Sequence, residues 1–164
     1  MIRRFNRDQA LSWTLWAACA LAAVGAVVVL AAPGRGENRI AVMAFPFAVG
    51  TAALAANALI PHRNPWLGGL LHALAGLGVA YGMAVGVSLP LRLAVEGGCS
   101  PAPAPCPLGF DRPMTGGESF GLEAAVACGF LALVLSFVAI ELQYRPRLRL
   151  FGPPPGSSTG HPGA

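Results

Sequence analysis

The sequence predicts an all-α integral membrane protein, with four transmembrane helices in an antiparallel bundle and both termini cytoplasmic. Two observations support this fold class. Hydrophobic residues make up 55% of the 164 residues and charged residues only 11%, whereas a soluble domain is usually about 25% charged. The charges also leave long stretches without any Asp, Glu, Lys or Arg. The soluble and disordered classes are therefore excluded, because disorder requires low hydrophobicity and high charge.

The four longest charge-free stretches are each long enough for a helix that crosses a bilayer. About 20 helical residues span a hydrocarbon core of about 30 Å. The predicted spans are residues 11–32, 40–60, 66–91 and 120–140, with residues 92–119 as an outer loop. Backbone polar groups in lipid must be paired within their own segment, so each span is expected to be helical. Residues 1–144 thus form a four-helix transmembrane domain.

The first span has features of a signal peptide, because Arg3, Arg4 and Arg7 precede its apolar run. That run is longer than the roughly 7–15 residues that are usual in signal peptides. Small residues at its end would permit cleavage, which leaves the signal-peptide alternative open. We interpret the segment as a retained helix.

The arginines predict the orientation. With four spans, both termini lie on one side of the membrane. That side carries Arg3, Arg4, Arg7, Arg63, Arg145, Arg147 and Arg149, and the other side carries Arg35, Arg39, Arg92 and Arg112. Cytoplasmic segments carry the excess of basic residues, so both termini are expected inside. The tryptophans Trp13, Trp16 and Trp66 then fall near the inner face, as in an aromatic belt.

The net charge of +4 could also indicate a nucleic-acid partner. We favour contacts with anionic lipid head groups, because the aromatic–basic interleaving of single-strand binders is missing. The chain has no lysine and is rich in Ala, Gly, Pro and Arg. This bias is typical of GC-rich genomes and predicts a bacterial cytoplasmic membrane.

Small residues at four-residue spacing predict how the helices pack. Such residues share one helix face and let helix backbones approach closely. The third span has Gly78, Gly82 and Gly86; the others have Ala18, Ala22 and Ala26, then Ala44, Ala48, Ala52 and Ala56, and finally Ala125 and Gly129. We interpret the glycine row as an intrachain packing face, with self-association as the alternative. Two prolines are expected to shape the helices: Pro46 as a kink within the second span and Pro90 as the end of the third.

Two of the four cysteines, Cys99 and Cys106, lie in the predicted outer loop. An oxidising compartment favours a disulfide between them. The alternating prolines between them favour an extended chain, which would separate the two Cα atoms by about 22 Å, against about 5.5 Å in a disulfide. The loop must therefore double back for the bond to form. Cys19 and Cys128 are interpreted as buried, unbridged residues.

Few polar side chains fall inside the spans. His72 is the clearest ionisable group at membrane depth, and Asn57 is expected at a similar depth. We interpret His72 as a neutral residue whose hydrogen-bond partner is Asn57 or a backbone carbonyl, which would hold the second and third spans together. The functional alternative makes His72 a proton relay or a ligand. Two interfacial ion pairs are also predicted, Arg92 with Glu123 and Arg63 with Glu141. Residues 145–164 are basic and then rich in Pro, Gly and Ser, which predicts a disordered cytoplasmic tail.

The sequence contains no nucleophile elbow, phosphate loop, metal-ligand cluster or enclosed carboxylate pair. No catalytic, cofactor-binding or metal-binding residue is therefore predicted. The leading hypothesis is a non-catalytic structural, accessory or regulatory subunit that contacts the lipid bilayer and binds a membrane-protein partner or copies of itself. The alternatives are an oligomeric transporter or channel for a small solute or ion, and a membrane thiol or lipid enzyme.

Overall fold

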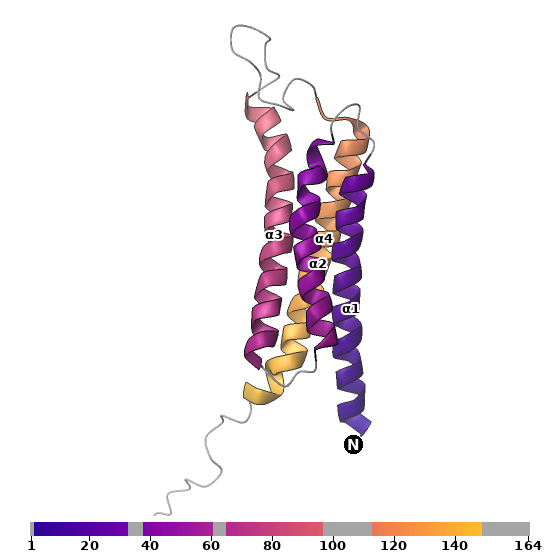
Figure 1. Ribbon diagram of the computed structural model, residues 1–164, viewed down its shortest axis with the longest axis vertical. Coiled ribbons are helices and arrows are strands. Elements are labelled where there is room, and N and C mark those ends of the chain that lie inside the picture. Colours follow the sequence, from indigo (N-terminus) through magenta and orange to yellow (C-terminus); the bar gives the residue numbers. More distant parts are fainter. Residues whose placement is uncertain (1, 33–37, 61–64, 97–112, 149–164) are drawn as a thin grey trace, which may run out of the picture.

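The computed structural model describes residues 2–32, 38–60, 65–96 and 113–148. Its elements are α1 (Ile2–Ala31), the 3₁₀ helix η1 (Arg39–Met43), α2 (Ala44–Leu59), α3 (Pro65–Glu96) and α4 (Gly116–Leu148) (Figure 1). The described residues contain no strand. Four helical segments are long and apolar enough to cross a membrane: Asp8–Ala31, Arg39–Leu59, Pro65–Ala94 and Gly116–Tyr144. The predictions of an all-helical chain and of four apolar helices are therefore confirmed.

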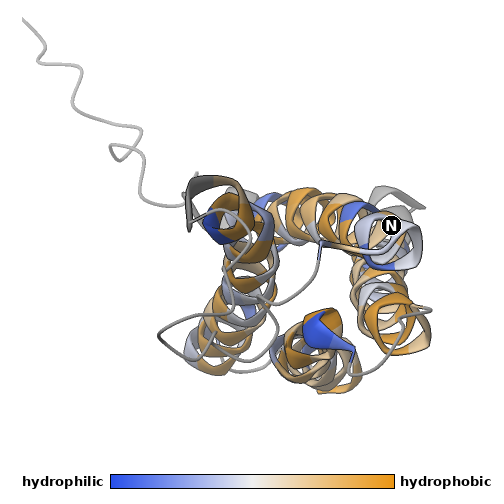
Figure 2. Ribbon diagram, turned by 90° about the horizontal axis from the view of Figure 1, so that it is seen from above, coloured by the Kyte–Doolittle hydropathy of each residue, from blue (hydrophilic) through white to orange (hydrophobic). Residues whose placement is uncertain are grey.

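The four helices form a ring in which consecutive helices are neighbours. Helix α1 packs extensively against both α2 and α4, and α2 packs against α3, whereas α3 and α4 contact each other least. Figure 1 shows the first residues of α1 and the last residues of α4 at the same end of the bundle. Seen from above, the four helices consist mostly of hydrophobic residues (Figure 2). Large apolar side chains such as Phe45, Leu77 and Phe120 are accordingly exposed, as expected of a surface that faces lipid.

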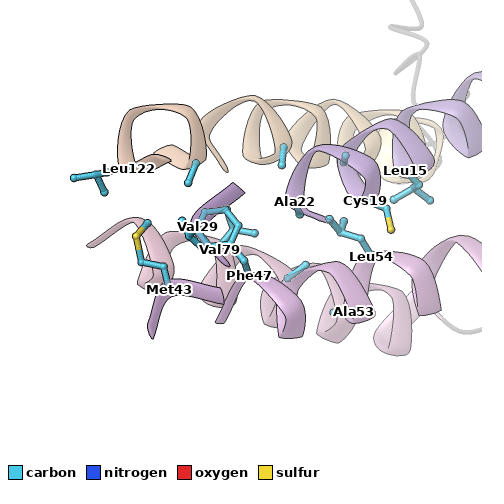
Figure 3. Packing of buried hydrophobic residues seen from close by; sticks show 14 of the residues in the cluster. Leu15, Cys19, Ala22, Val29, Met43, Phe47, Ala53, Leu54, Val79 and Leu122 are labelled. Carbon is cyan, nitrogen blue, oxygen red and sulfur yellow. The ribbon is translucent and has the colours of Figure 1, made fainter. Parts of the chain in front are cut away.

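The core combines many alanines with a few larger aliphatic side chains and one aromatic ring. Phe47 of α2 is fully buried and lies among the buried hydrophobic side chains shown in Figure 3. Its ring also lies next to a glycine on each of the other three helices. A Cβ added at Gly25 of α1 would lie 2.8 Å from Cε1 of Phe47, and one at Gly82 of α3 would lie 2.7 Å from Cδ2. One added at Gly129 of α4 would lie 3.0 Å from Cζ. These glycines therefore leave the space that the ring occupies.

Pro46 and Pro90 lie at other positions in their helices than the sequence predicted. Pro46 lies in the first turn of α2, directly after η1, rather than within a longer helix. Its missing N–H is not needed there, because the first N–H groups of a helix have no intrahelical partner. Pro90 lies inside α3, which continues to Glu96. A helix within a membrane tolerates proline. The carbonyl that Pro90 leaves without an N–H donor is that of Gly86, and the nearby hydroxyl of Ser88 donates to the preceding carbonyl, that of Val85, at 2.7 Å.

The alanine row predicted for the second span does not form a buried face. Ala48 and Ala52 are exposed and point away from the bundle, while Gly50, Ala53 and Asn57 are buried. Helix α2 is apolar on every side. Its sequence therefore contains no polar face that would show which side is turned towards the other helices and which side points away from the bundle. In the other helices, Ala18 and Ala22 of α1 and Ala125 and Gly129 of α4 are buried.

Candidate functional site: the seam between α3 and α4

Helix α3 presents the row Gly78, Gly82 and Gly86 to η1 and α2 of the same chain. A Cβ added at Gly78 would lie 2.8 Å from the carbonyl oxygen of Pro46. One added at Gly86 would collide with the side chain of Met43. The glycine row thus brings the α3 backbone close to α2, and this side of α3 is closed.

The opposite side of α3 faces α4 and is open along the seam. A second row of small residues lines it, spaced three or four residues apart: Gly69, Ala73, Gly76, Ala80 and Ala84. Larger side chains of α4 form the other wall: Leu122, Val126, Phe130, Leu133, Phe137 and Ile140. A Cβ added at Gly76 would meet no atom within 4 Å. At Gly76 the row therefore faces open space, whereas a Cβ added at Gly69 would lie 3.6 Å from the hydroxyl oxygen of Tyr144 on α4.

Two apolar grooves occupy this seam. The His72 groove, of about 320 Å³, is lined by residues 69–76 of α3 and 133–144 of α4. The Glu123 groove, of about 760 Å³, is lined by residues 80–87 of α3 and 122–130 of α4. Almost all of their surface is carbon, so in a bilayer they would be filled by lipid chains or by another apolar helix.

A polar network joins α3 to α4 behind the His72 groove. His72 is 4% exposed; its Nδ1 lies 3.1 Å from Oγ of Ser136 and its Nε2 lies 3.2 Å from Oε1 of Gln143. An amide oxygen can only accept, so in this arrangement Nε2 carries the proton and Nδ1 accepts from the serine hydroxyl. The hydroxyl of Tyr144 also donates to the carbonyl of Pro65 at 2.8 Å. These bonds fasten the two helices at one end of the seam.

The predicted hydrogen bond between Asn57 and His72 is absent from the described part of the chain. His72 bonds to α4 instead. Asn57 is 3% exposed, and its amide nitrogen has no hydrogen-bond partner among the described residues. It does lie near this network: a Cβ added at Gly68 would be 3.6 Å from Oδ1 of Asn57 and 2.8 Å from Nε2 of Gln143.

A buried ion pair that the sequence analysis did not predict lies at the other end of the bundle. The Arg39 guanidinium donates to both oxygens of Glu118, with Nη2 to Oε2 at 3.0 Å and Nε to Oε1 at 3.3 Å. Their side chains are only 8% and 0% exposed. Glu118 also accepts from the backbone N–H of Thr115 at 2.9 Å, and Thr115 Oγ1 accepts from the N–H of Glu118 at 3.2 Å. This is a capping box, and its Thr-x-x-Glu spacing at the start of α4 is the signal that could have revealed it.

The other predicted site residues are placed as follows. Arg92 and Glu123 are both exposed and form no ion pair with each other. Arg63, Cys99 and Cys106 lie outside the described residues, so the Arg63–Glu141 pair and the disulfide stay predictions, as does the tail beyond residue 148. Cys19 and Cys128 are unbridged, and the thiol of Cys19 donates to the carbonyl of Thr51 at 3.6 Å. No group of three His, Cys, Asp or Glu side chains within the described segments could hold a metal ion.

Comparisons with protein-family models, with curated proteins and with solved structures found no match.

Proposed function

We propose that this protein is a non-catalytic accessory or regulatory subunit that assembles with another membrane protein. The proposal rests on a difference between two parts of the seam of α3 and α4: its polar groups are hydrogen-bonded within the protein, and its apolar surface is open. Its polar groups form hydrogen bonds between the two helices: buried His72 bonds to buried Ser136, and the partly buried Tyr144 bonds to the carbonyl of Pro65. The rest of the seam is an open apolar surface with small residues on one wall, which is the kind of surface on which membrane helices associate.

The test is the composition of the protein when it is purified. The full chain is extracted from its native membrane in a mild detergent, and native mass spectrometry measures the mass of each complex. We expect a complex with one membrane-protein partner in fixed stoichiometry. A monomer without a partner, or a multimer of this chain alone, would contradict the proposal.

The proposed orientation places the antiparallel bundle in a bacterial cytoplasmic membrane with both termini cytoplasmic. The excess of arginine on the side of the termini supports it. So do Trp13, Trp16 and Trp66, which are exposed as belt residues should be. A reporter that is active only in the periplasm should be silent when fused after Tyr144 and active when inserted near Phe110. The reverse pattern would contradict this orientation.

A second candidate function, an oligomeric carrier of a small solute or ion, is favoured by one observation. His72 lines an apolar groove at a depth where ionisable groups are costly and often functional. Purified protein in liposomes should then conduct a solute or proton flux that His72→Leu abolishes. Liposomes without measurable flux, for protons and for common ions, would leave the accessory function as the better explanation.

A further inference from the structure

We propose that a buried water molecule is bound where α2, α3 and α4 meet, beside the backbone of Gly68. It is held by the side chains of Asn57, Gln143 and Tyr144. The proposal goes beyond the accessory function and does not depend on it. Two observations carry it: a buried amide nitrogen that has no hydrogen-bond partner among the described residues, and three polar groups that surround one glycine.

The first observation is the amide of Asn57. This side chain is buried near the end of α2, and its Nδ2 has no hydrogen-bond partner among the described residues. Buried polar groups nearly always bond to another protein group or to an ordered water. An unpaired donor is destabilising, the more so at membrane depth, where bulk water does not reach it. The amide of Asn57 therefore requires a hydrogen-bond acceptor at this place.

The second observation is the set of atoms around Gly68, which is buried in the first turns of α3. The three atoms nearest to a Cβ added there are all polar: Nε2 of Gln143 at 2.8 Å, Oη of Tyr144 at 3.4 Å and Oδ1 of Asn57 at 3.6 Å. At Gly82, in the apolar core, the three corresponding atoms are all carbons. Gly68 thus keeps a side chain out of a space that polar groups of two other helices surround.

The hydrogen-bonding capacities of these groups favour water as the occupant. The amide nitrogens of Asn57 and Gln143 can only donate. The hydroxyl of Tyr144 gives its proton to the carbonyl of Pro65 at 2.8 Å, so towards other groups its oxygen can only accept. The occupant must accept from the amides and donate to the phenol oxygen, which water does with the usual number of about three hydrogen bonds. An anion could not donate, and a metal ion could not accept from the amides.

The proposed water would connect α2 to the polar network of α3 and α4. Oε1 of Gln143 lies 3.2 Å from Nε2 of His72, and Nδ1 of His72 lies 3.1 Å from Oγ of Ser136. With the water in place, a continuous hydrogen-bonded chain joins three helices at the end of the bundle where α1 begins and α4 ends (Figure 1). Asn57 is then linked to His72 through the water and Gln143 instead of by a direct bond.

The test uses the full-length protein in nanodiscs of deuterated lipid. Nuclear magnetic resonance measures the transfer of magnetisation from water to the side-chain N–H groups of Asn57, which are assigned by their absence in Asn57→Leu. The control is the backbone N–H of Leu54, three residues earlier in the same helix and in a residue that is only 1% exposed. We expect transfer to the Asn57 amide and at least tenfold less transfer to Leu54.

Two neighbouring glycines provide a matched pair of variants. Gly68→Ala places a Cβ among the three polar atoms and should reduce the transfer to Asn57 at least tenfold. Nε2 of Gln143 is the end of a flexible side chain and can move aside, so this variant is expected to fold. Gly69→Ala places a Cβ near one polar atom only, Oη of Tyr144 at 3.6 Å, and should leave the transfer unchanged.

Stability gives a second readout with a definite sign. Asn57→Leu removes the link from α2 to the network and should lower the thermal aggregation midpoint by about 2–4 °C, a usual shift for a contact of this size in a chain of this length. Thr51→Val is the control on the same helix, because the hydroxyl of Thr51 donates within α2, to the carbonyl of Phe47 at 2.8 Å, and it should shift the midpoint less. If the Asn57 amide were unpaired, Asn57→Leu should instead raise the midpoint.

Four results would overturn the water site. The first is the lack of transfer from water to the Asn57 amide in the wild-type protein. The second is equal transfer to Asn57 and Leu54, which would show general entry of water into the bundle. The third is a transfer to Asn57 that Gly68→Ala leaves unchanged, and the fourth is a raised midpoint for Asn57→Leu. The wild-type measurement decides the question even where a variant does not fold.

Discussion

Helix α3 carries a row of small residues on each of two faces, and the two rows have opposite surroundings. Gly78, Gly82 and Gly86 lie so close to η1 and α2 that an added Cβ would collide with Pro46, Phe47 or Met43. Gly76 and the exposed Ala80 and Ala84, at the same spacing, face the open seam beside α4. Spacing therefore identifies faces that permit close approach, but it does not tell whether the partner helix belongs to the same chain.

Substitutions on the face of α3 that packs against α2 should destabilise the protein more than substitutions on the open face. The largest loss in the free energy of unfolding is expected for Phe47, which lies beside the closed face. Phe47→Ala removes a fully buried ring that fills the space beside three glycines. We expect a loss of about 3–5 kcal/mol in the free energy of unfolding. Phe45→Ala is the matched control, because Phe45 is two residues away and exposed to lipid. Unfolding in a mixed detergent titration measures both, and equal losses would show that Phe47 is not central to the core.

Helix α4 packs mainly against α1, and a buried ion pair also links it to η1. Glu118→Ala would leave the buried guanidinium of Arg39 without its carboxylate, although the carbonyl of Pro113 still accepts from it at 3.2 Å. We expect a loss of about 3 kcal/mol, at the lower end of the range for breaking a buried pair. Glu123→Ala lies on the same helix, but Glu123 is exposed and forms no ion pair among the described residues, so this change should alter the thermal aggregation midpoint little. Similar midpoints for the two variants would refute an anchoring role for Glu118.

The two small rows can be compared directly with one substitution on each. Gly82→Leu forces a side chain against Phe47 and Pro46, so it should cost about 1–3 kcal/mol by overpacking. Gly76→Leu enters open space and should be nearly neutral in the isolated protein. Thermal aggregation in detergent, with oligomer size recorded, measures both. The comparison fails if Gly76→Leu is the more destabilising of the pair.

The smallest loss of stability is expected for the hydrogen bonds that join α3 to α4 at one end of the seam. His72→Leu removes the hydrogen bonds to Ser136 and Gln143, and interhelical bonds in membranes contribute about 0.6 kcal/mol each on average. We therefore expect a loss of about 1 kcal/mol, and roughly half of that for Ser136→Ala. A loss of several kcal/mol for His72→Leu would mean that this fastening, rather than the packing of α2, positions α3.

Charge-free stretches predicted the four helices because the hydrocarbon core excludes charges, but they could not predict where the helices end. Helix α3 passes Pro90 and reaches Glu96, and α4 begins at Gly116 rather than Phe120. Both extensions lie where polar residues are acceptable, so hydropathy does not mark them. At the start of α4, the relevant signal was the capping box of Thr115 and Glu118, which is a local hydrogen-bond pattern and not a hydropathy pattern.

The polar contacts were harder to predict than the helices. His72 was recognised as important, yet its bonds run to Ser136 and Gln143 of α4 rather than to Asn57. The position of a residue within its predicted span indicates its depth in the membrane. Several helices pass through each depth, so depth alone does not identify the partner of a side chain. Choosing among them requires the rotation of each helix about its axis, and uniformly apolar helices such as α2 contain little information about that rotation.

The extensive packing of α1 against α4 has a consequence for the order of assembly. Membrane insertion follows synthesis from the N-terminus. Helix α1 can therefore pack against α4, its most extensive neighbour, only after α4 has been synthesised. Until then the face of α1 that bears Ala18 and Ala22 is covered by lipid where α4 will later lie. The ring can therefore close only after α4 has been synthesised, and a nascent chain that stops before Gly116 lacks the helix that completes it.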